Sequence, residues 1–268
     1  MTLTQDLKGI GRHILITGGS SGIGAELARQ YAEPGVAITL WGRNRRRLSQ
    51  IADEVRAKGS LVFTRQIDLA DSGKAIEAFA EADDELPVDV AILAAGLSHL
   101  RSAGKLIESA ESALAMAQVN FTTPVVMACE AAERMGRRRK GAIAFIGSVA
   151  SFHDLPQASV YSGTKAGIGR FSTALAAAMS PHNVSVTLII PGFIDTPMSQ
   201  RLKGVGRPFM LTVEKASAKI KRAIEERKLT LMFPWPFHVA RILDAHFPRP
   251  LVHKFLRIFH VMQRPEKK

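Results

Sequence analysis

Two residues near the middle of the chain have the types and spacing of a proton-transfer pair. Tyr161 and Lys165 are four residues apart, which places both side chains on one face of a helix. When a hydride reduces a carbonyl, the alkoxide formed needs a proton, and a phenol can donate it if its pKa falls from about 10 towards neutrality. A neighbouring ammonium lowers that pKa by favouring the phenolate. The pair therefore predicts carbonyl–alcohol chemistry, with Tyr161 as general acid and base.

Two more polar residues fall where they can join this pair. Ser148 lies thirteen residues before Tyr161, after an apolar run that predicts a strand, and its hydroxyl can orient and polarise a substrate carbonyl. Asn120 interrupts an otherwise apolar helical pattern. Each feature has a structural alternative: a solvated surface pair for Tyr161 and Lys165, and a buried hydrogen-bonding role for Asn120. Tyrosine occurs only twice in the chain, which makes a chance match of the pair less frequent.

A glycine-rich turn near the N-terminus has the pattern of a phosphate-binding site. It reads Thr17-Gly18-Gly19-Ser20-Ser21-Gly22-Ile23-Gly24 and lies between a β-branched run and a helical pattern. Glycine is needed there because a side chain would hold a pyrophosphate away from the backbone amides of the helix N-terminus. The strand–turn–helix context therefore predicts dinucleotide binding.

The end of the second predicted strand indicates which nicotinamide cofactor is bound. An acidic residue at this place suits the ribose 2′-hydroxyl of NAD(H), whereas arginine suits the 2′-phosphate of NADP(H). The segment from Leu40 to Arg47 contains no carboxylate, and Arg43 falls at the strand tip. We expect NADP(H), with NAD(H) as the alternative and Arg43 as the phosphate ligand. A solvated basic helix start is the simpler interpretation for Arg45, Arg46 and Arg47.

Together these motifs resemble the short-chain dehydrogenase/reductase family, over about His13 to Met198. The residues that carry the resemblance are Thr-Gly-x-x-x-Gly-Ile-Gly at the turn and Tyr-x-x-x-Lys at Tyr161. The resemblance implies an oxidoreductase acting on a CH–OH group, with Lys165 also binding the cofactor ribose. It implies that Asn120 supports a water chain that relays protons to the lysine. The implied catalytic residues are Asn120, Ser148, Tyr161 and Lys165.

The resemblance also implies contacts to the cofactor. Asp68-Leu69 matches the family's adenine-contacting Asp, and Pro191 to Thr196 matches Pro-Gly-x-x-x-Thr beside the nicotinamide. Leu93-Ala94-Ala95-Gly96 replaces the family's Asn-Asn-Ala-Gly, so both asparagines are missing while Gly96 still allows a close backbone approach. The expected cofactor-binding residues are Gly18, Ser20, Ser21, Gly22, Ile23, Gly24, Arg43, Asp68, Leu69, Ala95, Gly96, Tyr161, Lys165, Pro191, Gly192, Ile194 and Thr196.

Short β-branched runs alternate with longer helical patterns, which is typical of a buried parallel sheet. The predicted strands are His13–Thr17, Val36–Trp41, Leu61–Gln66, Val88–Leu93, Ala142–Gly147, Val184–Ile190 and Leu229–Phe233. The predicted helices are Gly22–Glu33, Asn44–Lys58, Ser72–Glu85, Ser109–Arg137 and Val160–Met179. We therefore predict an α/β fold: one Rossmann-like, doubly wound sheet of about seven strands with helices on both faces. All 268 residues are expected to form a single catalytic domain with a helical C-terminal extension.

Charge and composition limit the other functions. The net charge is +12, and residues 200–268 hold 16 Lys and Arg against 5 Asp and Glu, so nearly all of the excess lies in the last quarter. The chain has one cysteine, Cys129, which we expect to be a small buried side chain, and its eight histidines show no metal-ligand spacing. We predict no metal. The N-terminus has no apolar signal segment, which predicts a cytoplasmic protein.

The basic segment from about residue 199 is the least family-like part. Leu251–Met262 predicts an amphipathic helix with a broad apolar face and Lys254 and Arg257 beside it. Such a helix can lie in a membrane interface, here at the inner membrane surface, cap the substrate pocket, or pack in a dimer. An apolar, basic cover favours a hydrophobic or acyl-type substrate. Six prolines and few aromatics argue against nucleic-acid binding.

The sequence thus predicts an NADP(H)-dependent oxidoreductase that interconverts a carbonyl and a secondary alcohol. The alternative is a catalytically silent, NADP-binding scaffold or regulatory protein acting through its basic tail. The resemblance implies a homodimer formed through Ser109–Arg137 and Val160–Met179, with a tetramer as a further step.

Overall fold

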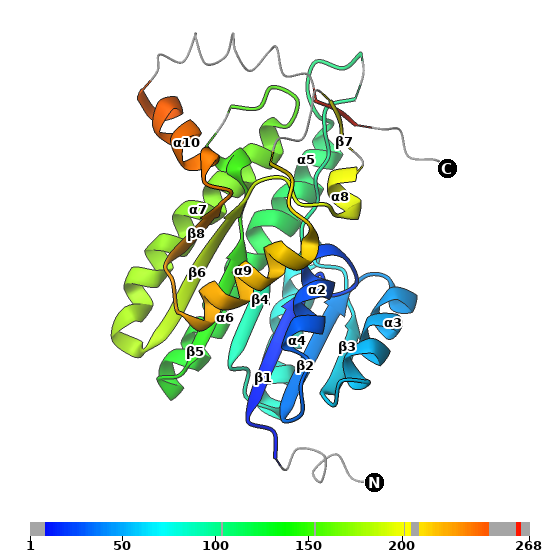
Figure 1. Ribbon diagram of the computed structural model, residues 1–268, viewed down its shortest axis with the longest axis vertical. Coiled ribbons are helices and arrows are strands. Elements are labelled where there is room, and N and C mark those ends of the chain that lie inside the picture. The colour runs from blue at the N-terminus through cyan, green and yellow to red at the C-terminus, as the bar shows by residue number, and fades with distance from the viewer. Residues whose placement is uncertain are drawn as a thin grey trace.

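The computed structural model describes residues 9–102, 104–152, 154–200, 202–204, 209–246 and 261–263. A seven-stranded, fully parallel sheet runs through it in the order β3-β2-β1-β4-β5-β6-β8 (Figure 1). Its strands are β1 (Arg12–Thr17), β2 (Val36–Gly42), β3 (Leu61–Gln66), β4 (Val90–Leu93), β5 (Gly141–Ile146), β6 (Val184–Pro191) and β8 (Thr230–Phe233). The order reverses between β1 and β4, where such sheets leave a crevice at the carboxyl ends of the strands.

Helices cover both faces of the sheet (Figure 1). Helices α2 (Gly22–Tyr31), α3 (Arg45–Arg56) and α9 (Val213–Glu225) share one apolar cluster with the sheet. Helices α4 (Ser72–Glu85), α6 (Thr123–Arg138) and α7 (Ser159–Met179) share the other. Helices cover both faces because the strands are apolar on both. In β1, Ile14 and Ile16 belong to the first cluster and Leu15 to the second. A strand buried on both faces has an uninterrupted apolar sequence, so the predicted fold class is confirmed.

The predicted helix Ser109–Arg137 consists of three continuous segments. Helix α5 (Ala110–Ala117) leads into a π-helical turn, η1 (Gln118–Thr122), and then into α6. Among the described helices, this stretch alone is long and apolar enough to cross a membrane by length and composition. Because Met127, Ala131 and Met135 are buried in the sheet-facing cluster, we interpret it as a core helix. Cys129 on its other side is exposed, so the expectation of a buried cysteine was wrong.

The part of the chain after Met198 is more regular than predicted. Helix α9 was missed: Thr212 caps it by accepting a hydrogen bond from Lys215 N (3.4 Å), and Ala216 and Ile220 are buried against α2 and the sheet. The spacing of these apolar residues is helical, but four Lys and Arg residues made the segment look like a solvated tail.

The described C-terminal elements are α8 (Pro197–Gln200), β7 (Leu202–Gly204), α10 (Pro236–His246) and β9 (Val261–Gln263). Strands β7 and β9 pair antiparallel. Residues 251–260 of the predicted helix Leu251–Met262 lie outside the described residues. The prediction is wrong for Val261 and Met262, which belong to β9 because they pair with the backbone of β7.

Candidate active site

Ser148, Tyr161 and Lys165 meet at the carboxyl end of β5. Ser148 follows this strand in the chain, and Tyr161 and Lys165 lie on adjacent turns of α7. The Ser148 side chain lies near enough to the Tyr161 hydroxyl to lower the pKa of that phenol. The Lys165 ammonium lies 5.8 Å from the centroid of the Tyr161 ring and donates to the Ile146 carbonyl (2.8 Å). The serine, phenol and ammonium therefore form one connected group where the last residues of β5 end.

Burial dominates the protonation of this group. Lys165 is 6% exposed, and desolvation lowers its pKa to about 8. Burial raises the pKa of Tyr161, and the hydrogen bond with Ser148 offsets part of this rise. We expected the ammonium to lower the phenol pKa, but the protein by itself has the opposite effect. The cause is desolvation of the buried phenol, which outweighs the lowering of its pKa by Ser148.

Asn120 lies in the π-helical turn and holds the loop that follows β4. Its side-chain oxygen accepts from Leu97 N (2.7 Å), and its amide donates to Leu97 O (2.8 Å) and to Thr164 Oγ1 (3.4 Å). π-Helical turns often occur at functional sites. The turn at Asn120 is therefore consistent with a functional site. In this structure Asn120 acts as a buried hydrogen-bonding residue that connects the β4 loop to α7.

The glycine turn lies against the end of β4. Gly18 has a positive φ of 70°, and a Cβ on it would come within 2.9 Å of Ala95 Cα. Gly24 admits no side chain either, because its Cβ would lie 2.5 Å from Gly18 O. Ala95 N donates to Thr17 Oγ1 (3.1 Å), so a threonine of β1 holds the strand end at which the family's asparagines are missing.

The other predicted cofactor residues lie around this turn. A Cβ on Gly22 would be 3.4 Å from Thr196 Cγ2, and one on Gly42 would be 3.0 Å from Ser20 Oγ. Gly96 faces Asn120 Oδ1 and Lys165 Nζ, at 3.3 and 3.7 Å from a Cβ placed on it. Ser21 is exposed and Ile23 partly exposed at the start of α2. Asp68 is exposed and accepts from Ala70 N (3.0 Å), while Leu69 O accepts from Thr123 Oγ1 (2.6 Å).

The segment after β6 forms the other side of the crevice. It starts at Pro191, and Ile194 is buried and bridges to Leu211. A Cβ on Gly192 would collide with the Phe237 ring of α10. The predicted nicotinamide segment therefore lies between the glycine turn on one side and α10 on the other.

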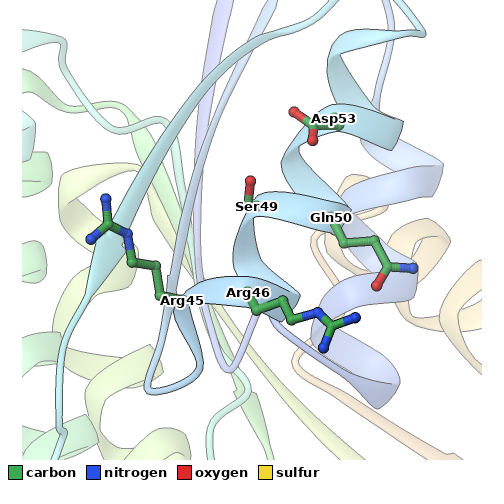
Figure 2. A pocket seen from close by; sticks show the side chains of 5 residues that line it. All are labelled: Arg45, Arg46, Ser49, Gln50 and Asp53. Atoms are coloured by element: carbon green, nitrogen blue, oxygen red, sulfur yellow. The ribbon is translucent and has the colours of Figure 1, made fainter.

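The arginines after β2 separate into two groups. Arg43 at the strand tip is exposed, and the described residues offer its guanidinium no partner, while its carbonyl accepts from Gln66 Nε2 (3.1 Å). Arg45 and Arg46 belong to the outer face of α3. Figure 2 shows their side chains extending in opposite directions beside a shallow hollow, which is lined by Arg45, Arg46, Ser49, Gln50 and Asp53.

The buried residues can accept a dinucleotide with a ribose against Lys165. Its ammonium carries three N–H donors, and among the described residues only the Ile146 carbonyl receives one. A buried donor without a partner is costly. A side chain at position 96 would come within 3.7 Å of the ammonium, so the glycine keeps this approach to Lys165 free of protein atoms.

Comparison with known proteins agrees with this geometry. The family model for short chain dehydrogenases matches residues 12–204. The chain belongs to the short chain dehydrogenase family. It is 30% identical to human short-chain dehydrogenase/reductase 3 over 267 residues, 95% of this chain and 87% of that protein. It is 27% identical to a short chain dehydrogenase of Pseudocercospora fijiensis, of whose length it spans 61%.

A solved structure of the family has the same fold as this chain. The chain matches a short-chain dehydrogenase from Sphingobium yanoikuyae in complex with NADPH, with a TM-score of 0.77 and 28% identity. The match covers 92% of this chain and 95% of that one. This chain is therefore an oxidoreductase of the short chain dehydrogenase family, and a nicotinamide cofactor fits its fold.

Glu108 is a functional residue that the sequence analysis missed. Its buried carboxylate accepts from Ser159 Oγ (2.8 Å) and from Val160 N (3.1 Å), at the first turn of the helix that carries Tyr161. The residue before this helix, Ala158, provides no side-chain cap. Glu108 thus caps the helix from 51 residues away in the chain, with the charge that a helix N-terminus favours. Nothing in the local sequence indicates such a distant contact.

Replacing Lys165 with methionine should stabilise the fold while removing activity. The folded-state pKa of about 8 lies below the usual lysine value of 10.5, so the buried charge opposes folding at neutral pH. Between these two values only the unfolded chain keeps the proton, and the cost shrinks as pH rises. Urea unfolding should show the variant more stable by about 1–3 kcal/mol at pH 7, and by less at pH 9.5. A difference that does not change with pH would contradict the assignment.

Replacing Glu108 with alanine should lower both stability and kcat. Loss of the cap should cost about 1–2 kcal/mol in urea unfolding. Because Tyr161 lies on the first turn of the capped helix, kcat should fall while the KM for NADPH stays nearly constant. Glu111→Ala, at an exposed acidic residue in the first turn of α5, is the matched control. Equal effects of the two substitutions would show that Glu108 does not position the helix.

Proposed function

We propose that this protein is an NADP(H)-dependent reductase that interconverts a carbonyl and a secondary alcohol on a hydrophobic substrate. The observation that carries the proposal is the group of Ser148, Tyr161 and Lys165 at the end of β5, in which Lys165 is 6% exposed and its ammonium has one acceptor among the described residues. A silent scaffold has no use for such a group, since burying the ammonium opposes folding.

The proposed reaction uses each member of this group in turn. Bound NADPH supplies the hydride. Ser148 donates a hydrogen bond to the substrate carbonyl and holds it beside the Tyr161 hydroxyl. Tyr161 then transfers its proton to the oxygen as negative charge develops there, and takes it back in the reverse reaction. Lys165 binds the cofactor ribose and stabilises the phenolate that Tyr161 leaves behind.

The proposed cofactor site follows the crevice from the glycine turn to Thr196. The backbone amides of Ser20 to Ile23 would hold the pyrophosphate, and Asp68 would contact the adenine. Arg43 is available for a 2′-phosphate because no described carboxylate or carbonyl engages its guanidinium. A planar fork of donors suits a dianion. NADP(H) is therefore favoured over NAD(H).

The proposed substrate is apolar because aromatic side chains lie beside the segments that follow β5 and β6. Phe237 lies over Gly192 and contacts Phe209 edge to face, with ring centroids 6.5 Å apart. On the side of Ser148, Phe152 is covered by the Arg241 guanidinium, 4.4 Å from the ring centroid. A hydrophobic or acyl-type carbonyl compound with an anionic end would match this combination.

We also propose a homodimer, formed by the outer faces of α5, α6 and α7. Leu114 is 70% exposed, and Phe121 and Cys129 are exposed on the same helical stretch. On α7, small residues such as Gly163 and Ala166 leave the outer face flat and exposed. Apolar, flat helix faces of this kind pack well against a second copy.

Tyr161→Phe should abolish the reaction but leave cofactor binding intact. Loss of the proton donor should reduce kcat for NADPH-linked ketone reduction about 10²–10⁴-fold. NADPH affinity, measured by nicotinamide fluorescence, should change little. Tyr31→Phe is the matched control, because Tyr31 is the other tyrosine and is buried beneath Arg12 and Lys221. Full activity of the Tyr161 variant would overturn the proposed function.

Arg43→Ala should weaken NADPH binding and leave NADH binding unchanged. Loss of a charge-assisted contact to the 2′-phosphate corresponds to roughly 10–100-fold in Kd. Arg46→Ala is the control, since Arg46 lies on the outer face of α3 (Figure 2). The NADP preference is wrong if both variants bind NADPH like the wild type, or if Arg46→Ala has the larger effect.

A further inference from the structure

Exposed large apolar side chains gather at one end of the molecule. Trp235 is 73% exposed, Val239 46% and Ile242 59%, all at the start of α10 or on it. Leu106 and Ile107, in the loop before α5, are 95% and 63% exposed. Figure 1 shows α10 and the start of α5 beyond the carboxyl ends of the strands, the end at which the crevice opens. Apolar exposure on this scale marks an interaction surface.

Helix α10 has two different faces. Trp235, Val239 and Ile242 are spaced by four and three residues, so they form one stripe along the helix. Phe237 lies on another side, packed against Gly192 and the apolar cluster of the sheet. The inner face therefore holds the helix on the domain beside the nicotinamide segment, while an apolar stripe remains exposed.

Basic residues accompany the apolar ones. Lys105 is exposed next to Leu106, and Arg241 is exposed next to Ile242. The whole chain carries a net charge of +12. Tryptophan beside an apolar stripe, with cations around it, suits the boundary between the acyl chains and the headgroups of a lipid bilayer. The excess positive charge favours anionic headgroups.

We propose that this end of the protein docks on the surface of a lipid bilayer that contains anionic lipids. The surface consists of Trp235, Val239, Ile242, Leu106 and Ile107, and we call it the apolar rim. Because the rim lies at the end of the sheet where the strands lead to Ser148 and Tyr161, an apolar substrate dissolved in the bilayer would reach these residues from the docked side. This route for the substrate rests on the proposed function, whereas membrane docking does not.

The two tryptophans of the chain make docking directly measurable. Trp41 is fully buried in the sheet, and Trp235 lies in the apolar rim. Vesicles of phosphatidylcholine with phosphatidylglycerol should shift the emission of the full-length protein to the blue, and brominated acyl chains should quench it. Trp235→Phe should remove both signals, and vesicles of phosphatidylcholine alone should bind more weakly.

Sedimentation with the same vesicles tests which residues bind. The double variants Val239→Ser with Ile242→Ser, and Leu106→Ser with Ile107→Ser, should each weaken binding roughly tenfold through the loss of buried apolar area. Leu229→Ser is the matched control and should bind like the wild type. Leu229 is 55% exposed but precedes β8, at the opposite end of the sheet.

The outcomes separate docking from its alternatives. A wild-type protein that binds NADPH but no vesicles overturns the proposal. The proposal is also overturned if a rim variant still binds vesicles but is monomeric in sedimentation velocity where the wild type is a dimer. The rim is then an interface between two copies of the protein. Retained NADPH binding shows that each variant is folded. Vesicle binding by a protein that binds no NADPH supports docking and counts only against the proposed function.

Discussion

Each central strand of the sheet buries side chains on both faces, so every return connection must cross one face or the other. The connections of β1 to β3 use one face and those of β4 to β6 mainly the other, and the order reverses between β1 and β4. Neighbouring loops therefore leave that boundary in opposite directions and open a crevice. The glycine turn, the loop at Gly96 and the segment after Pro191 all meet there, although the chain separates them widely.

Burial of Lys165 and Tyr161 explains both their protonation and the loss of folding stability that comes with it. Lys165 reaches the crevice through the core, with its ammonium against the last carbonyl of β5. Desolvation lowers its pKa and raises that of Tyr161, so the protein alone favours less charge at both groups. At neutral pH the buried Lys165 charge opposes folding, whereas the neutral Tyr161 does not. The π-helical turn at Asn120 and the distant cap from Glu108 hold the surrounding loops in place around this pair.

The apolar rim relates this site to the rest of the molecule. Phe237 and Val239 lie on the same helix, one facing Gly192 in the crevice and the other facing outwards. Helix α10 therefore contacts the segment after β6 with one face and leaves its other face exposed. The loop before α5 has the same arrangement, since Glu108 points inwards to the helix of Tyr161 while Leu106 and Ile107 point outwards.

The sequence by itself determined the alternation of strands and helices, the fold class and the family, because apolar periodicity and closely spaced motifs are local properties. It also identified Tyr161 and Lys165 by their spacing along one helix. Tertiary structure decided what depends on distant partners: the cap of α7 by Glu108, the hydrogen bond from Ala95 N to Thr17, and the burial of the basic helix α9. It also reversed the expected pKa of Tyr161 and exposed Cys129, because desolvation depends on what packs around a side chain and no local pattern records that.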